Sequence, residues 1–378
     1  MELLSRAREL ESGGRSIVHM EIGEPDFPTP PLICEAGIAA LRKGALFYTP
    51  ALGLPQLREA IAAFYHQRYG VEISPGRVII TSGSSAALLL AVALLVDPGD
   101  RVLVSDPGYP CNRHFVRVMG GEPVGVAVGA DSNYQLNPEL VARHWDGRTV
   151  ATLAASPSNP TGTLIPGADL RAIAELAKER GGALIVDEIY HGLVYEGAAR
   201  TALEVDENVF IINSFSKYFH MTGWRLGWMV APQAFMREIE TLAQNIYLAA
   251  PTPAQYAALA AFAPETMALL ETHRNEFKAR RDYLVPALRR LGFDIPLTPE
   301  GAFYIYAGCS SLGADSFALA HELLERAGVA VTPGIDFGSN APERHVRFAY
   351  TNSLGQLQEG VRRIDAYLAG LSRNRLPQ

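Results

Sequence analysis

From residue 52 to residue 230, short apolar runs alternate with helical patterns. Several runs are apolar throughout, which is typical of strands that are covered on both faces. Helical segments such as 54–69, 84–96 and 169–180 lie between them. This order predicts an α/β domain with a mostly parallel central sheet flanked by helices. The expected strands are residues 77–81, 101–105, 123–128, 149–155, 183–187, 209–213 and 226–231.

The pattern changes near residue 264, where a long helix rich in Arg and Glu (264–291) begins. An α+β stretch follows, with expected strands at 301–306, 329–332 and 345–349 and expected helices at 315–327 and 354–371. We therefore predict a large α/β domain at residues 45–275 and a smaller α+β domain made of residues 1–44 and 276–378. No Gly/Ser-rich or Pro-rich linker separates them, so we expect close packing around a ligand-binding cleft.

Composition excludes several classes of protein. The formal net charge is -7 and no basic run is present, which disfavours binding to nucleic acid. The longest apolar run, residues 86–96, is shorter than the roughly 18 residues of a membrane span. Cys34, Cys111 and Cys309 fit neither a disulfide framework nor a metal site. Residues 1–15 lack the apolar core of a signal peptide, so we expect a cytoplasmic protein with no bound metal.

Two candidate catalytic residues follow predicted strands. Asp187 ends the apolar run 183–187, at the carboxyl end of a strand, where open α/β sheets bind ligands. Lys217 follows the next strand, with Phe215 and Tyr218 beside it. An apolar pocket lowers the pKa of a lysine and makes its amine a nucleophile toward a carbonyl. The alternatives are a helix cap for Asp187 and a solvated surface lysine for Lys217.

A second group of residues suits an anion. Arg225 is flanked by two Gly and two Trp, which suits a planar, bidentate contact with phosphate or carboxylate. Ser84 and Ser85 begin a helix after a strand, where backbone N–H groups and hydroxyls can approach an anion. Their segment lacks the spacing of a Walker loop or a dinucleotide-binding loop. The alternatives are a structural ion pair for Arg225 and an ordinary helix cap for the serines.

The loop 156–162 (SPSNPTG) follows another predicted strand. It contains the bonds Ser156-Pro157 and Asn159-Pro160, and either bond could be cis. Two prolines three residues apart make a rigid loop that would hold the Asn159 amide in one place. A turn without chemistry is the alternative. Because all of these residues fall at strand ends of one predicted sheet, we expect them to form a single site.

With these motifs the chain resembles the class I/II aminotransferases, pyridoxal 5'-phosphate (PLP) enzymes of fold type I in the aspartate aminotransferase superfamily. The most specific element is Ser214-x-Ser216-Lys217 with Arg225 eight residues after the lysine. The resemblance covers nearly the whole chain and is also carried by segments 22–27 (IGEPDF), 48–50 (YTP), 156–162, 187–190 (DEIY), 301–304 (GAFY), 332–338 and 346–348 (VRF). It implies transfer of an amino group from an L-amino acid to a 2-oxo acid by a ping-pong mechanism.

The resemblance also implies the role of each matching residue. Lys217 would carry PLP as a Schiff base and then act as the general base. Asp187 would keep the pyridine nitrogen protonated, so that the ring withdraws electrons from the substrate Cα. Tyr190 would assist these two residues and, with Asn159, would hydrogen-bond the phenolic oxygen. The implied cofactor-binding residues are Ser84, Ser85, Tyr109, Asn159, Asp187, Tyr190, Ser214, Lys217, Arg225 and Tyr48.

Two further implications concern the substrate and the assembly. Arg347 would bind the substrate α-carboxylate as a bidentate fork, assisted by Asn159 and the backbone of Gly23. Tyr48 would reach the PLP phosphate of the neighbouring subunit, so the resemblance implies a homodimer. Without the resemblance, a packing role for Tyr109 and a surface ion pair for Arg347 would be the simpler interpretations.

The substrate side chain is less constrained by the sequence. Some aspartate-acting relatives have a Lys at the position of Ser85, so its absence disfavours a dedicated dicarboxylic specificity. We expect segments 17–22 and 244–253 to line a pocket for neutral or hydrophobic side chains, through Met20, Ile22, Tyr247 and Leu248. A PLP-dependent carbon–sulfur β-lyase on the same scaffold is the alternative function. A non-enzymatic protein is disfavoured because Lys217 is present and no helix-turn-helix pattern is appended.

Overall fold

The centre of the molecule is a seven-stranded sheet, within residues 2–44, 46–312 and 315–374 that the computed structural model describes. Strand β8 is antiparallel to both neighbours, and the other neighbouring pairs are parallel. The mostly parallel sheet is therefore confirmed, with each predicted strand end within one residue of the observed one. The strand order is β2 (Val78–Thr81), β8 (Gly227–Val230), β7 (Phe210–Ser214), β6 (Ala183–Asp187), β5 (Thr149–Ala155), β3 (Arg101–Asp106) and β4 (Glu122–Ala127).

Helices cover both faces of this sheet, which explains why its strands are apolar throughout. Side chains such as Ile79, Val104 and Ile212 form one core with the helices α4 (Ser84–Leu95), α5 (Pro110–Val118) and α8 (Met236–Ile246). Alternate side chains such as Ile80 and Val186 form the other core with α3 (Pro55–Tyr69), α6 (Pro138–His144) and α7 (Gly167–Glu179). Each fully buried aliphatic side chain contributes about 1.5–3 kcal/mol of hydrophobic free energy. None of the helices in the described ranges is long and apolar enough to cross a membrane.

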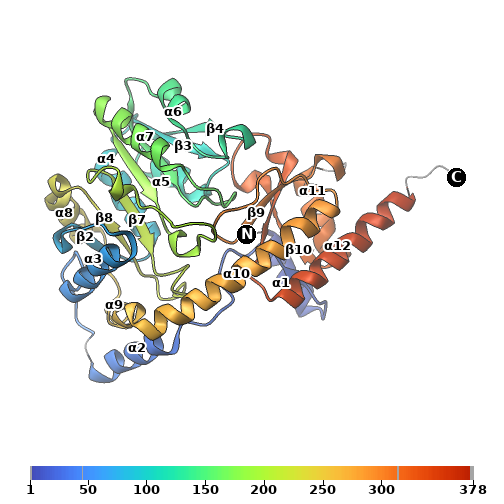
Figure 1. The fold of residues 1–378 in the computed structure, drawn as a ribbon, viewed down its shortest axis with the longest axis horizontal. Helices are drawn as coiled ribbons and strands as arrows, with labels where there is room; N and C mark the ends of the chain where they lie inside the picture. Colours follow the sequence, from blue (N-terminus) through green and yellow to red (C-terminus); the bar gives the residue numbers. More distant parts are fainter. Residues whose placement is uncertain (1, 45, 313–314, 375–378) are drawn as a thin grey trace.

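A smaller lobe lies at the other end of the molecule (Figure 1). Its antiparallel sheet has the order β11 (Thr332–Pro333), β12 (His345–Ala349), β9 (Tyr304–Gly308), and a parallel pair joins β1 (Val18–His19) to β10 (Val329–Ala330). The lobe also contains α1 (Glu2–Ser12), α11 (Ser316–Glu322) and α12 (Leu354–Asn374). The long helix α10 (Pro264–Arg290) runs between the two lobes in Figure 1.

The small lobe departs from the predicted elements in three places. The single strand predicted at 329–332 is wrong, because Val329 pairs with β1 whereas Thr332 pairs with Arg347 on β12. The helix predicted at 315–327 is α-helical only as far as Glu322, and the next five residues, Leu323–Ala327, form a π-helical turn. The strand predicted at 301–306 begins only at Tyr304.

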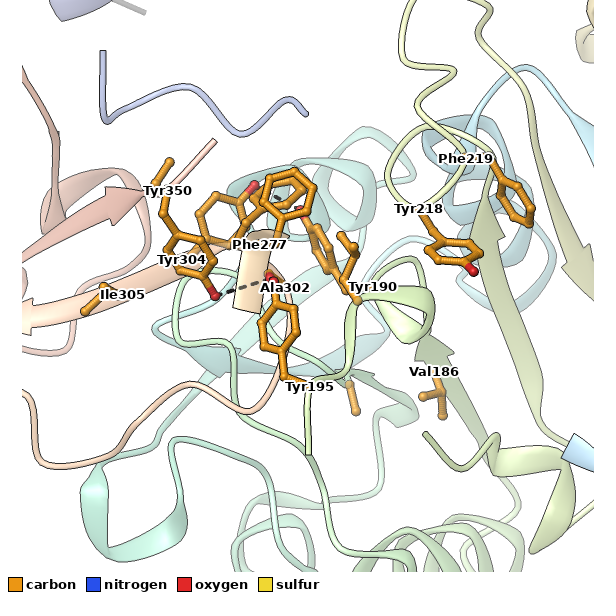
Figure 2. Close-up of a cluster of buried hydrophobic side chains, with 14 of the residues drawn as sticks. Val186, Tyr190, Tyr195, Tyr218, Phe219, Phe277, Ala302, Tyr304, Ile305 and Tyr350 are labelled. Atoms are coloured by element: carbon orange, nitrogen blue, oxygen red, sulfur yellow. Dashed lines mark hydrogen bonds between the residues drawn. The ribbon is translucent and has the colours of Figure 1, made fainter. Parts of the chain in front are cut away.

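A turn at Gly301–Phe303 accounts for that late strand start. Ala302 has a φ of 57° and cannot continue a strand. Its carbonyl oxygen accepts hydrogen bonds from the hydroxyls of Tyr195 and Tyr350 (Figure 2). This turn brings chain from the large lobe and from the small lobe together beside Tyr304.

The predicted domain boundaries stay a prediction, and residue 45 lies outside the described residues. Helix α2 (Pro31–Lys43), predicted in the small domain, packs against α9 (Thr252–Ala258) beside the large lobe (Figure 1). Gly37 permits this close approach, since a Cβ there would lie 2.6 Å from the Trp224 ring and 3.4 Å from the Cβ of Ala257 on α9. The helices α1, α2, α5, α6, α8 and α9 were not predicted from the sequence.

Phe277 on α10 tests the packing between the lobes. Its side chain is 0% exposed and contacts the rings of Phe27 and Phe303 at centroid distances of 5.3 and 5.6 Å (Figure 2 shows Phe277). We expect Phe277→Ala to lower the free energy of unfolding in urea by about 3–5 kcal/mol, because it leaves a cavity. Phe277→Leu is the control and should cost about 1–2 kcal/mol. Equal losses in the two variants would contradict this account.

Candidate active site

A cavity of about 390 Å³ opens at the carboxyl edge of the central sheet. Its volume lies within the range of about 300–1,000 Å³ that is common for small-molecule sites. The cavity draws residues from the N-terminal segment, the large lobe and the small lobe. The predicted site residues that line it are Gly23, Ser84, Ser85, Tyr109, Asn159, Asp187, Tyr190, Lys217, Arg225 and Arg347.

Lys217 follows β7 and projects its amine into this cavity. The Nζ atom donates a hydrogen bond to the carbonyl oxygen of Gly23 at 2.7 Å. Burial lowers the pKa of Lys217 to about 8, an effect that Glu24 opposes and Arg347 reinforces. Roughly a tenth of such amines are uncharged at pH 7. The amine can therefore act as a nucleophile toward a carbonyl or accept a proton.

Asp187 is the last residue of β6 and is 4% exposed. Its Oδ1 atom accepts a hydrogen bond from the Ile189 backbone N–H at 3.2 Å, and no described cationic side chain forms an ion pair with it. Burial raises the pKa of Asp187 to about 7. A buried carboxylate without a counter-ion favours a cationic ligand group in the cavity.

Arg347 approaches the cavity from β12 of the small lobe and is 7% exposed. Its guanidinium stacks on the ring of Tyr304 at 4.2 Å and donates to the Glu21 carbonyl oxygen at 2.7 Å. It also donates to the Asn159 side-chain oxygen at 2.9 Å. Its Nε atom has no hydrogen-bond partner, and no carboxylate in the described ranges pairs with it. This buried cation is suited to an anionic ligand.

An anion-binding corner lies at the N-terminus of α4. Ser84 and Ser85 form the first turn of this helix, where backbone N–H groups are free. Arg225 donates to the Thr222 carbonyl oxygen at 3.0 Å and has no ion pair with a described carboxylate. Gly83, with a φ of 79°, makes room for it, since a Cβ there would lie 2.5 Å from Arg225 Nη2. Two hydroxyls, backbone donors and a guanidinium together suit a phosphate.

Tyr190 and Asn159 line the same cavity as Asp187 and Arg347. The hydroxyls of Tyr190 and Tyr304 are 3.0 Å apart, and Figure 2 shows both rings in the buried aromatic cluster. Burial raises the pKa of Tyr190 well above its usual value, so the hydroxyl keeps its proton and can donate. Both X-Pro bonds of the loop that carries Asn159 are cis.

Two predicted site residues do not line the cavity. The Ser214 hydroxyl is buried, donates to the Leu226 carbonyl oxygen at 3.4 Å and accepts from the Ser216 N–H at 3.0 Å. Ser216 lines the cavity in its place. Tyr48 is 83% exposed and is also absent from the lining.

The predicted specificity pocket also differs. Ile22 lines the cavity as expected, but Met20, Tyr247 and Leu248 do not. Met20 is instead fully buried beside Gly360 on α12.

Four further residues with polar side chains, which were not among the predicted site residues, line the cavity: Glu24, Ser216, Thr222 and Tyr304. Glu24 accepts a hydrogen bond from the Thr222 hydroxyl, which joins the N-terminal segment to the loop after Lys217. Tyr304 contacts Gly23 so closely that no Cβ fits there. Glu24 and Tyr304 lie in the segments IGEPDF and GAFY, which carry the family resemblance, so these segments could have indicated both residues as part of the site.

These groups fit PLP, whose parts need different partners. The anion-binding corner suits its phosphate, the Lys217 amine suits its aldehyde, and the buried Asp187 carboxylate suits its ring nitrogen. Among the described residues, no group of three His, Cys, Asp or Glu side chains could hold a metal ion. The fold and the cavity thus define a PLP-dependent enzyme.

The sequence profile of the family Aminotransferase class I and II matches residues 15–364, and the chain belongs to this family. It is 39% identical to a valine–pyruvate aminotransferase of Mycobacterium tuberculosis, over 97% of this chain and 95% of that protein. It is 36% identical to an aspartate/prephenate aminotransferase of Thermus thermophilus, over 95% and 93% of the two chains. The chain is therefore an aminotransferase that uses PLP, and the lyase alternative is not favoured.

Solved structures agree with this assignment. The crystal structure of an aminotransferase from Mycobacterium tuberculosis has a TM-score of 0.95 at 39% identity, covering 98% of this chain and 96% of that one. The aspartate aminotransferase of Thermus thermophilus with maleate has a TM-score of 0.91 at 35% identity, covering 97% and 95%. The predicted fold, a large domain with a mostly parallel sheet and a smaller α+β domain, matches the aminotransferase fold.

Asp187→Asn tests the cost of the buried carboxylate in the cofactor-free protein. Because the pKa of Asp187 is raised, the stability linked to this group is lost as the pH rises from about 4 to about 7. Asn removes this loss, so we expect the variant to unfold at higher urea concentration than the wild type at pH 8, by up to ~4 kcal/mol. At pH 4 the two proteins should unfold alike. A variant that is less stable at pH 8 would contradict the raised pKa.

Proposed function

We propose that this aminotransferase transfers the amino group of an L-amino acid to a 2-oxo acid in two half-reactions at the cavity described above. The carrying observation is that the Lys217 amine, the Asp187 carboxylate and the Arg347 guanidinium line one cavity without matching counter-ions in the described chain. The catalytic residues are Lys217, Asp187 and Tyr190. When bound, PLP supplies an electron sink for the bonding electrons of the substrate Cα.

Each part of the cavity holds one part of the cofactor in this proposal. Ser84, Ser85 and Arg225 bind the phosphate, and Ser216 contributes from the cavity wall. Tyr109 packs on the ring, and Asp187 stays charged beside the ring nitrogen. Tyr190 donates its proton, and Asn159 its amide, to the phenolic oxygen.

In this proposal Arg347 binds the substrate, and Lys217 transfers the proton. Arg347 binds the α-carboxylate, as a planar guanidinium does best, while its stacking on Tyr304 fixes the plane of the fork. The Lys217 amine, with a pKa lowered to about 8, takes the proton from the substrate Cα and returns it during the exchange. The hydrogen bond from the Thr222 hydroxyl to Glu24 joins the N-terminal segment to the loop after Lys217 at the wall of the same cavity.

The absorption spectrum of the purified, PLP-loaded protein tests this function. We expect visible absorbance that a single L-amino acid removes and a 2-oxo acid restores, because the amino group is stored on the protein between the two half-reactions. Lys217→Ala should lose both the reducible linkage to PLP and more than about 10³-fold of the turnover, since a nucleophile and base are removed together. Release of pyruvate and ammonia from cystathionine without a 2-oxo acid would indicate the lyase instead.

We also propose a homodimer in which Tyr48 completes the neighbouring active site. Leu46, Phe47 and Tyr48 are exposed, and none of them lines the cavity of its own subunit. Ile246 and Leu248 are exposed apolar side chains as well. A symmetric dimer would cover such side chains and place Tyr48 at the phosphate of the partner.

Mixing two inactive variants tests this shared site. Lys217→Ala and Tyr48→Ala should each lower turnover, and mixed dimers formed after dissociation and reassociation should contain one site with both native residues. We expect the mixture to regain up to roughly a quarter of wild-type turnover, since half of the dimers are mixed and each has one intact site. Mixing without dissociation is the control. No gain after reassociation, or a fully active monomer in sedimentation, would refute the arrangement.

A cytoplasmic location is part of the proposal. Its support is that Cys34, Cys111 and Cys309 are all free thiols, as is usual in a reducing compartment. The amino acid and 2-oxo acid substrates are common there. The names of the relatives, valine–pyruvate and aspartate/prephenate aminotransferase, include both a neutral and an acidic amino acid. They therefore do not indicate which class of amino acid this chain accepts.

A further inference from the structure

A second cavity, of about 450 Å³, adjoins the first on the small-lobe side. The two cavities share wall residues, and Arg347 is one of them, so a group bound at this guanidinium borders both spaces. The shared residues are Ile22, Gly23, Tyr109, Asn159 and Arg347. The PLP-binding groups Ser84, Asp187, Lys217 and Arg225 line only the first cavity.

Most of the remaining wall of the second cavity is apolar. It comes from α1, the start of α5, α11 and the segment from β10 to the loop after β11. The apolar and weakly polar side chains there are Leu3, Leu4, Pro110, Cys111, Phe317, Val331, Pro333 and Phe337. Such a wall favours an apolar occupant, since each buried CH₂ gains about 0.8 kcal/mol.

The charges in this wall are negative apart from Arg347. Glu2, Glu21 and Asp336 line the cavity, and no lysine or second arginine does so among the described residues. Glu21 is buried and forms an ion pair with His19 through Oε1 at 2.7 Å, which offsets part of its charge, whereas its Oε2 has no hydrogen-bond partner. A carboxylate placed in this space would therefore meet other carboxylates and would lack a cation.

We propose that the second cavity holds the substrate side chain and that it selects L-amino acids with uncharged, apolar side chains over aspartate and glutamate. This inference rests on the proposed role of Arg347 as the α-carboxylate site. With that carboxylate on Arg347 and the amino group directed at Lys217, the side chain has the second cavity as its space. The volume is sufficient for branched, thioether and aromatic side chains.

The first test measures the amino-donor half-reaction alone. PLP-loaded protein is mixed separately with L-valine, L-leucine, L-methionine, L-phenylalanine, L-aspartate and L-glutamate, and the loss of visible absorbance gives a second-order rate constant for each. We expect at least one apolar amino acid to exceed both dicarboxylic ones by about tenfold or more. Equal or faster reaction of aspartate or glutamate would overturn the substrate class and leave transamination intact. No absorbance change with any amino acid would instead refute the proposed function.

The second test places a cation in the cavity. Phe317 is 44% exposed on α11, so Phe317→Arg should fold, and Phe317→Met is the uncharged control of similar length. We expect the arginine variant to raise the ratio of the aspartate to the leucine rate constant by about tenfold, whereas the methionine variant keeps the wild-type ratio. Leu4→Lys on α1 repeats the test from the opposite wall, with Leu4→Met as its control. An unchanged ratio in both charged variants would refute the placement of the side chain.

Discussion

Three ionisable side chains line one cavity without a matching counter-ion in the described chain: Asp187 and Arg347, which are buried, and Lys217, which is partly buried. Burying an unpaired charge costs several kcal/mol, and burial accordingly shifts the pKa of Asp187 up and the pKa of Lys217 down, each toward the neutral form. The cavity keeps its charges because a charged cofactor and a charged substrate are the missing partners. The hydrophobic free energy of the apolar cores on both faces of the central sheet offsets this cost.

The two lobes supply different charges to this cavity. Asp187 and Lys217 stand at the ends of neighbouring parallel strands, β6 and β7, so the sheet fixes their spacing. Arg347 stands on β12, the middle strand of the small-lobe sheet, and reaches the same space from the other side. The site therefore exists only when the lobes are packed together, and the buried aromatic cluster of Figure 2, with Tyr304 and Phe277, lies at that junction.

The parts of this arrangement that are local in sequence were predictable. Apolar runs ending in Asp187 and before Lys217 predicted the strands and the edge where these residues meet, since parallel strands share one carboxyl edge. Non-local pairing was not predictable: whether residues 329–332 form one strand or two depends on β1 and β12, which are distant in sequence. The contribution of Ser216 to the wall in place of Ser214, and the contact of Tyr304 with Tyr190, likewise depend on side-chain packing that a sequence pattern does not encode.

In this proposal the reaction and the specificity are built from different parts of the chain. The groups suited to PLP come from strand ends and adjoining turns of the large lobe, where the sheet holds them rigidly. The second cavity is lined largely by α1, α11 and small-lobe loops, none of which carries a group for the chemistry. Arg347 is the charged residue that borders both spaces, and in the proposed function it binds the α-carboxylate, the substrate group that every amino acid has. Side chains in α1 and α11 can thus change the amino acid that is accepted while the electrostatics of Asp187 and Lys217 stay as they are.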